Sequence, residues 1–160
     1  MTAKNKERKM HRATAKRLLD RLIKDVQEYN EDMGHPYYVE AIHVFGSYVN
    51  SDKEMLSDLD IALAWEDNKE VWMDWYAENL DDIKKGLRVK QDPSLLDALL
   101  YSRRRAIIGF RHGSPYIQLT DYHVDREAVE SQRHIRIDMD IDGCTWTSLG
   151  GKTDESQGRL

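Results

Sequence analysis

The 160-residue sequence lacks the features that mark disulfide-bonded, zinc-finger and membrane proteins. Cys144 is its only cysteine, which excludes an intramolecular disulfide and a zinc site built from several cysteines. No apolar run approaches the roughly 20 residues of a membrane span, and the basic N-terminus lacks the apolar stretch of a secretory signal. These absences predict a cytoplasmic protein that has no membrane partner.

Charge is spread unevenly over what the length predicts to be a single domain, residues 1–160. Residues 1–25 contain nine basic and three acidic side chains, a net charge of +6, whereas the whole chain carries −5. A basic end on an acidic body indicates a polyanionic partner, either a nucleic acid or an acidic protein. A solvated helix face is the alternative, and the sequence leaves both open.

Hydrophobic spacing predicts an α+β fold, in which helices pack on a small mixed β-sheet. The first predicted element, within residues 1–30, is a basic amphipathic helix from Met10 to about Tyr29. Residues 143–160 are rich in Gly, Ser and Thr, and we expect a mobile tail there. The remaining predicted elements are strands at Tyr38–Phe45, Ser57–Trp65, Tyr116–Tyr122 and His134–Asp142, and helices at 67–88, 93–108 and Asp125–Gln132.

Two aspartates occupy alternate positions of the second predicted strand. Asp58 and Asp60 therefore project from one face, opposite the apolar residues between and after them. Two carboxylates so close repel each other unless a cation lies between them. Magnesium prefers carboxylate oxygens and shares its other positions with water and substrate phosphates. Such a pair can hold two ions that clamp the oxygens of a phosphoryl displacement.

A Gly-Ser turn ends the preceding predicted strand, ten residues before the aspartates. Gly46 lets the backbone approach a ligand closely, and exposed N–H groups of such a turn form an anion-binding nest. The Ser47 hydroxyl can donate a further hydrogen bond to a phosphate. Each motif alone is weak, but together and in this order they predict a joint metal and phosphate site.

The segment Phe45-Gly46-Ser47, followed by Ser-Asp-Leu-Asp-Ile-Ala-Leu at 57–63, resembles the signature of the DNA polymerase beta-like nucleotidyltransferase superfamily, in its small, minimal form. The resemblance covers residues 44–63. It implies transfer of a nucleoside monophosphate from an NTP to a hydroxyl of RNA, protein or a small molecule, with release of pyrophosphate. It also implies two Mg²⁺ ions on Asp58 and Asp60, and a triphosphate held by Gly46 and Ser47.

The resemblance further implies a third carboxylate, from a later strand, that binds one metal and helps to deprotonate the attacking hydroxyl. Asp138 is the favoured residue, because it lies between the apolar Ile137 and Met139 in a strand that alternates cleanly. Arg136-Ile137-Asp138-Met139 also resembles the corresponding strand of the polymerase beta branch. Asp121 and Asp140 remain open as alternatives.

One departure from the family pattern concerns the residues after the Gly-Ser turn. Members often carry an arginine and a glycine there, whereas Tyr48–Glu54 contains no arginine, and only Lys53 offers positive charge to a triphosphate. This departure keeps a second function open, a non-catalytic binding or regulatory module of the same fold, such as a toxin–antitoxin partner.

Overall fold

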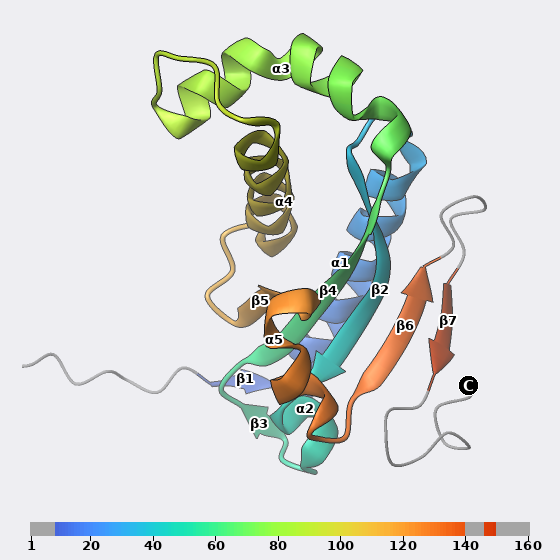
Figure 1. The fold of residues 1–160 in the computed structure, drawn as a ribbon. Coiled ribbons are helices and arrows are strands. Elements are labelled where there is room, and N and C mark those ends of the chain that lie inside the picture. Colours follow the sequence, from blue (N-terminus) through green and yellow to red (C-terminus); the bar gives the residue numbers. More distant parts are fainter. Residues whose placement is uncertain (1–8, 140–145, 150–160) are drawn as a thin grey trace, which may run out of the picture.

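The computed structural model describes residues 9–139 and 146–149, which form the α+β fold that the sequence predicts. Five strands make one sheet in the order β5-β4-β2-β6-β7, and β1 and β3 form a separate two-stranded sheet (Figure 1). Strands and helices have the following bounds: β1 Met10–His11, α1 Arg12–Glu31, β2 Tyr37–Phe45, α2 Ser47–Asn50, β3 Met55–Leu56, β4 Leu59–Asp67, a 3₁₀ turn Lys69–Val71, α3 Trp72–Leu87, α4 Leu95–Arg111, β5 Ile117–Asp121, α5 Tyr122–Glu130, β6 Ile135–Met139 and β7 Trp146–Leu149.

The two strands that carry the polar motifs are neighbours at the centre of the large sheet. β2 pairs antiparallel with both β4 and β6, whereas β4 pairs parallel with β5. The β2–β4 register places Phe45 opposite Asp60, so the end of β2 meets the start of β4. The residues that follow Phe45 and the residues that precede Leu59 therefore lie at the same edge of the sheet.

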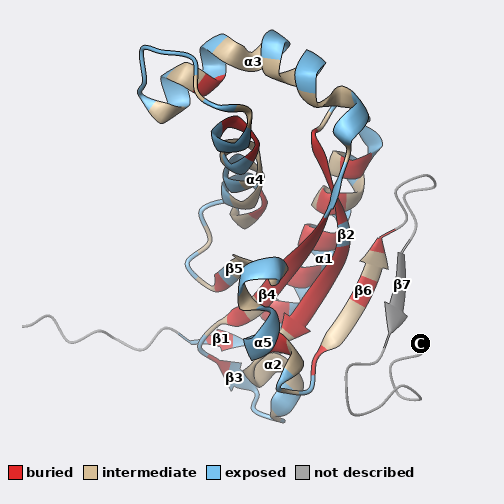
Figure 2. Ribbon diagram, viewed as in Figure 1, coloured by how far each residue is buried: buried red, intermediate tan, exposed pale blue. Residues whose placement is uncertain are grey.

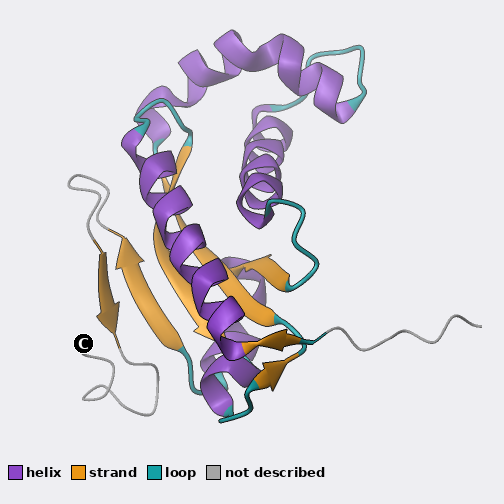
Figure 3. Ribbon diagram, turned by 180° about the vertical axis from the view of Figure 1, so that it is seen from behind, coloured by secondary structure: helices purple, strands orange, loops and turns teal. Residues whose placement is uncertain are grey.

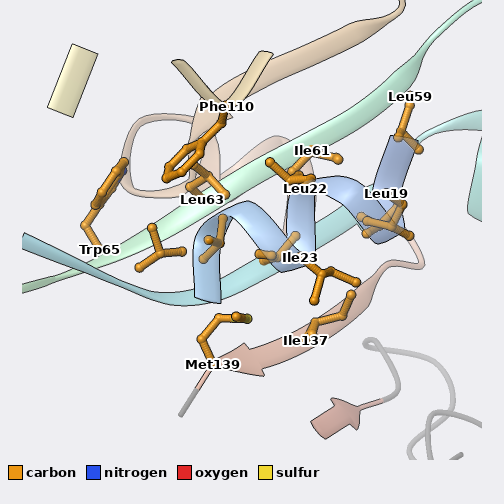
Figure 4. Packing of buried hydrophobic residues seen from close by; sticks show 14 of the residues in the cluster. Leu19, Leu22, Ile23, Leu59, Ile61, Leu63, Trp65, Phe110, Ile137 and Met139 are labelled. Carbon is orange, nitrogen blue, oxygen red and sulfur yellow. The ribbon is translucent and has the colours of Figure 1, made fainter. Parts of the chain in front are cut away.

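The hydrophobic core lies between α1 and one face of the sheet, as the view from behind shows (Figure 3). Leu22 and Ile23 of α1 pack against Ile61 and Leu63 of β4, and Phe110 of α4 closes one side of the cluster (Figure 4). Most of β2 and β4 is buried (Figure 2). Because each such side chain contributes roughly 1.5–3 kcal/mol when it leaves water, this cluster fixes which face of β4 turns inward.

The opposite face of the sheet is covered by α5. His43 of β2, which alternates with the core residues Ile42 and Val44, stacks on Tyr122 of α5 with ring centroids 4.0 Å apart. Asp60 shares this second face, because it alternates with Leu59 and Ile61, which are completely buried. The core thus holds the Asp60 carboxylate on the side of the sheet away from α1.

Several predicted boundaries and the predicted tail differ from the structure. α1 begins at Arg12 rather than at Met10, and β4 begins at Leu59 rather than at Ser57, so Asp58 lies directly before the strand. α5 begins at Tyr122 rather than at Asp125, because the Asp121 side chain caps it by accepting from the His123 amide. α4 begins at Leu95 after the cap residue Ser94, so Pro93 precedes the helix. Residues 146–149, inside the expected tail, form β7 against β6; the rest of that stretch lies outside the described residues. None of the helices in the described ranges is long and apolar enough to cross a membrane.

Candidate active site

The Gly-Ser turn and the aspartate pair make one site, because the Asp60 carboxylate packs directly on the Gly46 backbone. Gly46 has φ +72°, a conformation that favours glycine. A Cβ atom at this position would lie only 2.1 Å from Oδ2 of Asp60. Glycine is therefore required here for two reasons, the backbone conformation and the space that the carboxylate occupies.

Asp58 and Asp60 lie beside each other, as their alternation predicts. Burial of Asp60, the negative charge of Asp58 and a hydrogen bond between the two carboxyl groups raise the pKa of Asp60 to about 6. Without a cation, Asp60 therefore keeps its proton up to about pH 6, well above the usual range of an aspartate. A hard divalent cation that bound both carboxylates would relieve the same repulsion, so this donor set fits Mg²⁺.

After Gly46 the chain turns through the single helical turn α2. The amides of Val49 and Asn50 donate to the Gly46 carbonyl, and the amide of Ser51 donates to the Ser47 carbonyl. Within the described ranges, no hydrogen bond engages the Ser47 hydroxyl or the amides of Ser47 and Tyr48. These three donors are the ones left for an anion beside Asp60.

The Gly46 amide is already engaged, which modifies the predicted anion nest. Gln132, in the connection between α5 and β6, accepts this N–H with its side-chain oxygen at 3.0 Å. Asn50 donates to the same oxygen at 3.1 Å, to the Gly46 carbonyl at 3.0 Å and to the Arg133 carbonyl at 2.9 Å. A connection 86 residues away in sequence thereby holds the turn in place. No local sequence signal marks Gln132, because its partners Gly46 and Asn50 are distant in the chain.

The structure does not bring Asp138 to the aspartate pair, so the role of Asp138 as the third carboxylate stays a prediction that this arrangement does not support. Asp138 lies opposite Ala41 of β2, four residues before Phe45, which lies opposite Asp60. With ordinary strand spacings this separation amounts to about 16 Å. The Asp138 carboxylate instead accepts from Nε of Arg136 at 2.6 Å. Alternation identified the correct face of this strand, but register depends on pairing that alternation does not determine.

Of the two alternative acids, Asp121 is not brought to the aspartate pair. Asp121 lies opposite Leu63, forms an ion pair with Arg103 of α4 and caps α5. Asp140 lies outside the described residues. The β5 residue opposite Asp60 is Gln118, which is exposed and uncharged. Across residues 9–139 and 146–149, no group of three or more His, Cys, Asp or Glu side chains is arranged to hold a metal ion.

Lys53 is exposed in the connection between α2 and β3. Its backbone carbonyl accepts from Arg12 at 3.0 Å, and its amide donates to the Ser51 hydroxyl. In the described part of the chain, no contact joins the Lys53 ammonium to Gly46, Ser47 or the aspartates. The predicted role of Lys53 toward a triphosphate therefore remains a prediction.

Comparison with known proteins agrees with the geometry of the two motifs. Residues 24–101 match the family described as "Polymerase beta, Nucleotidyltransferase", and the match includes the Gly-Ser turn and both aspartates. This part of the chain belongs to the polymerase beta-like nucleotidyltransferase superfamily, which supports nucleotidyltransferase activity in general, with an NTP and a divalent metal as the usual ligands. No curated protein and no solved structure shows a significant match.

Proposed function

We propose that this protein transfers a nucleoside monophosphate from an NTP to a hydroxyl acceptor and releases pyrophosphate. The observation that carries the proposal is the packing of the Asp60 carboxylate on the Gly46 backbone, which joins a metal-binding pair to a turn with free donors. Family membership over residues 24–101 supports the same reaction class. Asp58 and Asp60 are the proposed ligands of two Mg²⁺ ions, and Gly46 and Ser47 form the proposed phosphate turn.

The proposed chemistry relies on positioning and charge neutralisation. The Ser47 hydroxyl and the amides of Ser47 and Tyr48 donate hydrogen bonds to the phosphates that leave. Asp60 on the buried strand β4, and Asp58 directly before that strand, would hold the cations beside the α-phosphate. When bound, Mg²⁺ neutralises the charge that develops on the attacking and leaving oxygens.

A second candidate function is a non-catalytic binding or regulatory module with the same fold. The observation that favours it is Gln118, a neutral side chain at the β5 position opposite Asp60, where a third carboxylate would share the site. The described residues provide no other acid there. In this case the aspartate pair binds a metal–nucleotide complex without turnover, or it serves only the fold.

Incubation with α-labelled NTPs, Mg²⁺ and candidate RNA, protein and small-molecule acceptors distinguishes the two functions. We expect Mg²⁺-dependent transfer of label that Asp58→Asn and Asp60→Asn both abolish while the fold persists. Asp67→Asn is the matched control, because Asp67 is an exposed carboxylate at the far end of the same strand. Binding of an NTP without transfer to any acceptor supports the module, and full transfer by Asp60→Asn refutes the proposed enzyme site.

We further propose that an acidic acceptor, nucleic acid or protein, contacts the exposed basic side chains of α1. Lys16 and Lys24 each pair with an acid four residues later, and such exposed pairs remain open to a phosphate. Neutralising four basic residues should weaken the binding of a nucleic-acid acceptor and lower the log–log salt slope by about 0.7 to 0.9 for each phosphate that the protein no longer neutralises. Acceptor affinity that stays normal and independent of salt excludes this surface. The four residues are Lys16, Arg17, Arg21 and Lys24.

A further inference from the structure

Arg12, the first residue of α1, binds the backbone that follows the Gly46–Ser47 turn. Its guanidinium donates to three main-chain carbonyls: Nη1 to Tyr48 at 2.6 Å, Nη2 to Ser51 at 2.8 Å and Nε to Lys53 at 3.0 Å. The guanidinium carbon also lies 5.1 Å from the centroid of the Tyr48 ring. A single side chain thus holds three carbonyls of residues 48–53.

The chemistry of arginine suits this position. The last carbonyls of a helical turn have no partner within the helix, and a positive charge near them is favourable. Arginine offers five N–H donors in a planar fork, so one side chain can satisfy several carbonyls at once. All three nitrogens of Arg12 donate to the C-terminal side of α2, whereas Ser47 begins the same turn beside Asp60. Arg12 therefore restrains the turn from the end opposite the aspartates.

The backbone around Arg12 is anchored to the same connection. β1 pairs with β3, where Met10 lies opposite Leu56, and both side chains are buried. The Arg12 amide donates to the Glu54 carbonyl at 2.8 Å. Residues 10–12 consequently hold the connection between the two polar motifs through backbone pairing, apolar burial and the guanidinium. The basic residues of the N-terminal segment predicted a polyanion-binding surface that would include Arg12. The contacts of Arg12 give it a different role from the exposed basic residues of α1.

We propose that Arg12 is a positioning residue of the NTP site, an inference that rests on the proposed function. Arg12 fixes the backbone of residues 48–53 and, through α2, the placement of the Ser47 hydroxyl beside Asp60. It does not itself contact the nucleotide, because its nitrogens are engaged by carbonyls. The restraint acts equally in the ground and transition states, so it contributes to the affinity for the NTP rather than to the chemical step.

The test compares Arg12→Ala and Arg12→Lys with Arg105→Ala. Arg105 lies on α4, carries the same charge and is exposed, and it belongs to neither the proposed NTP site nor the proposed acceptor surface, which makes it a suitable control. Two properties are measured: hydrogen–deuterium exchange of peptides that cover residues 46–54, and kcat and KM for the NTP. In Arg12→Ala we expect about tenfold faster exchange in this segment and about tenfold higher KM, with kcat within about twofold of wild type. Arg12→Lys should lie between, because an ammonium cannot reach all three carbonyls, and Arg105→Ala should match wild type.

The outcomes separate this inference from the proposed function. Unchanged exchange in Arg12→Ala overturns the restraint, whatever the activity is. Faster exchange with an unchanged KM overturns the role of Arg12 toward the NTP. A wild-type protein that neither binds nor turns over any NTP overturns the proposed function, and with it the assignment of Arg12 to an NTP site, even if exchange rises in the variant. If Arg12→Ala fails to fold by circular dichroism, Arg12→Lys carries the same comparison.

Discussion

Acidification should destabilise this protein through His43, a buried imidazole on the α5 side of the sheet. His43 is 2% exposed, and neither ring nitrogen has a hydrogen-bond partner among the described residues. Burial lowers the pKa of His43 to about 3, and the nearby charges of His134 and Arg136 add to this effect. Glu130 raises the pKa in part, and His123 lowers it slightly. The folded protein therefore resists protonation of a group that protonates readily once the chain unfolds.

The magnitude follows from the two pKa values. The unfolded chain binds the proton near pH 6.5 and the folded chain near pH 3, so the contribution of neutral His43 is complete above pH 6.5 and declines as pH falls. At pH 5 the linkage relation gives a loss of about 2 kcal/mol relative to pH 8. For one proton, the free energy of unfolding changes by no more than about 1.4 kcal/mol per pH unit.

Urea unfolding between pH 8 and pH 5 measures this loss. In His43→Phe a flat ring can still stack on Tyr122 but cannot take up a proton, so we expect the wild-type stability loss to shrink by about 2 kcal/mol at pH 5. The comparison uses the change in the free energy of unfolding between pH 8 and pH 5 for each protein. Any packing cost of the larger ring is the same at both pH values and therefore drops out. The raised pKa of Asp60 makes acidification stabilise the folded protein through that group. Because Asp60 is present in both proteins, its contribution cancels in the comparison. The exposed His11→Gln is the control; the reasoning is refuted if His43→Phe follows the same pH profile as wild type.

Three further substitutions test the site and its surroundings. Gly46→Ala should destabilise the fold by about 1–2 kcal/mol in urea unfolding and abolish NTP binding in calorimetry, because its Cβ displaces the Asp60 carboxylate; wild-type affinity would contradict this. Asp121→Ala should cost about 2–3 kcal/mol in the same unfolding assay, since it removes both the ion pair with Arg103 and the cap of α5, whereas an unchanged midpoint would show that neither matters. Asp138→Ala should keep near-normal label transfer, and an inactive, folded variant would reinstate Asp138 as a catalytic residue.

Local patterns in the sequence predicted the elements that hold the aspartate pair. The alternation of Leu59 and Ile61 with Asp60 predicted that Asp60 faces away from the core, and in the structure Leu59 and Ile61 are buried whereas Asp60 is only partly buried. Gly46 and Ser47 interrupt a strand of β-branched and aromatic residues, which located the turn. These predictions hold because each depends on residues within one or two positions of each other.

Features that depend on tertiary pairing could not be predicted in the same way. The register of β6 against β2 separates Asp138 from Asp60, although both lie on the same face. Gln132 and Arg12 contact the Gly-Ser turn and the residues after it from opposite ends of the chain, and no spacing rule connects them to it. Charge alone placed Arg12 with a polyanion-binding surface, whereas its hydrogen bonds assign it to the backbone of residues 48–53.

The most direct test of the proposed site is calorimetric titration of a non-hydrolysable NTP analogue into the wild-type protein and Asp60→Asn, each with and without Mg²⁺. The proposed site requires Asp60 and the turn at Gly46 to hold one metal–nucleotide complex. Binding should therefore appear only in the wild-type protein with Mg²⁺ present, and Asp67→Asn should bind as wild type does. Equal binding by Asp60→Asn, or binding that does not depend on Mg²⁺, would contradict the assignment.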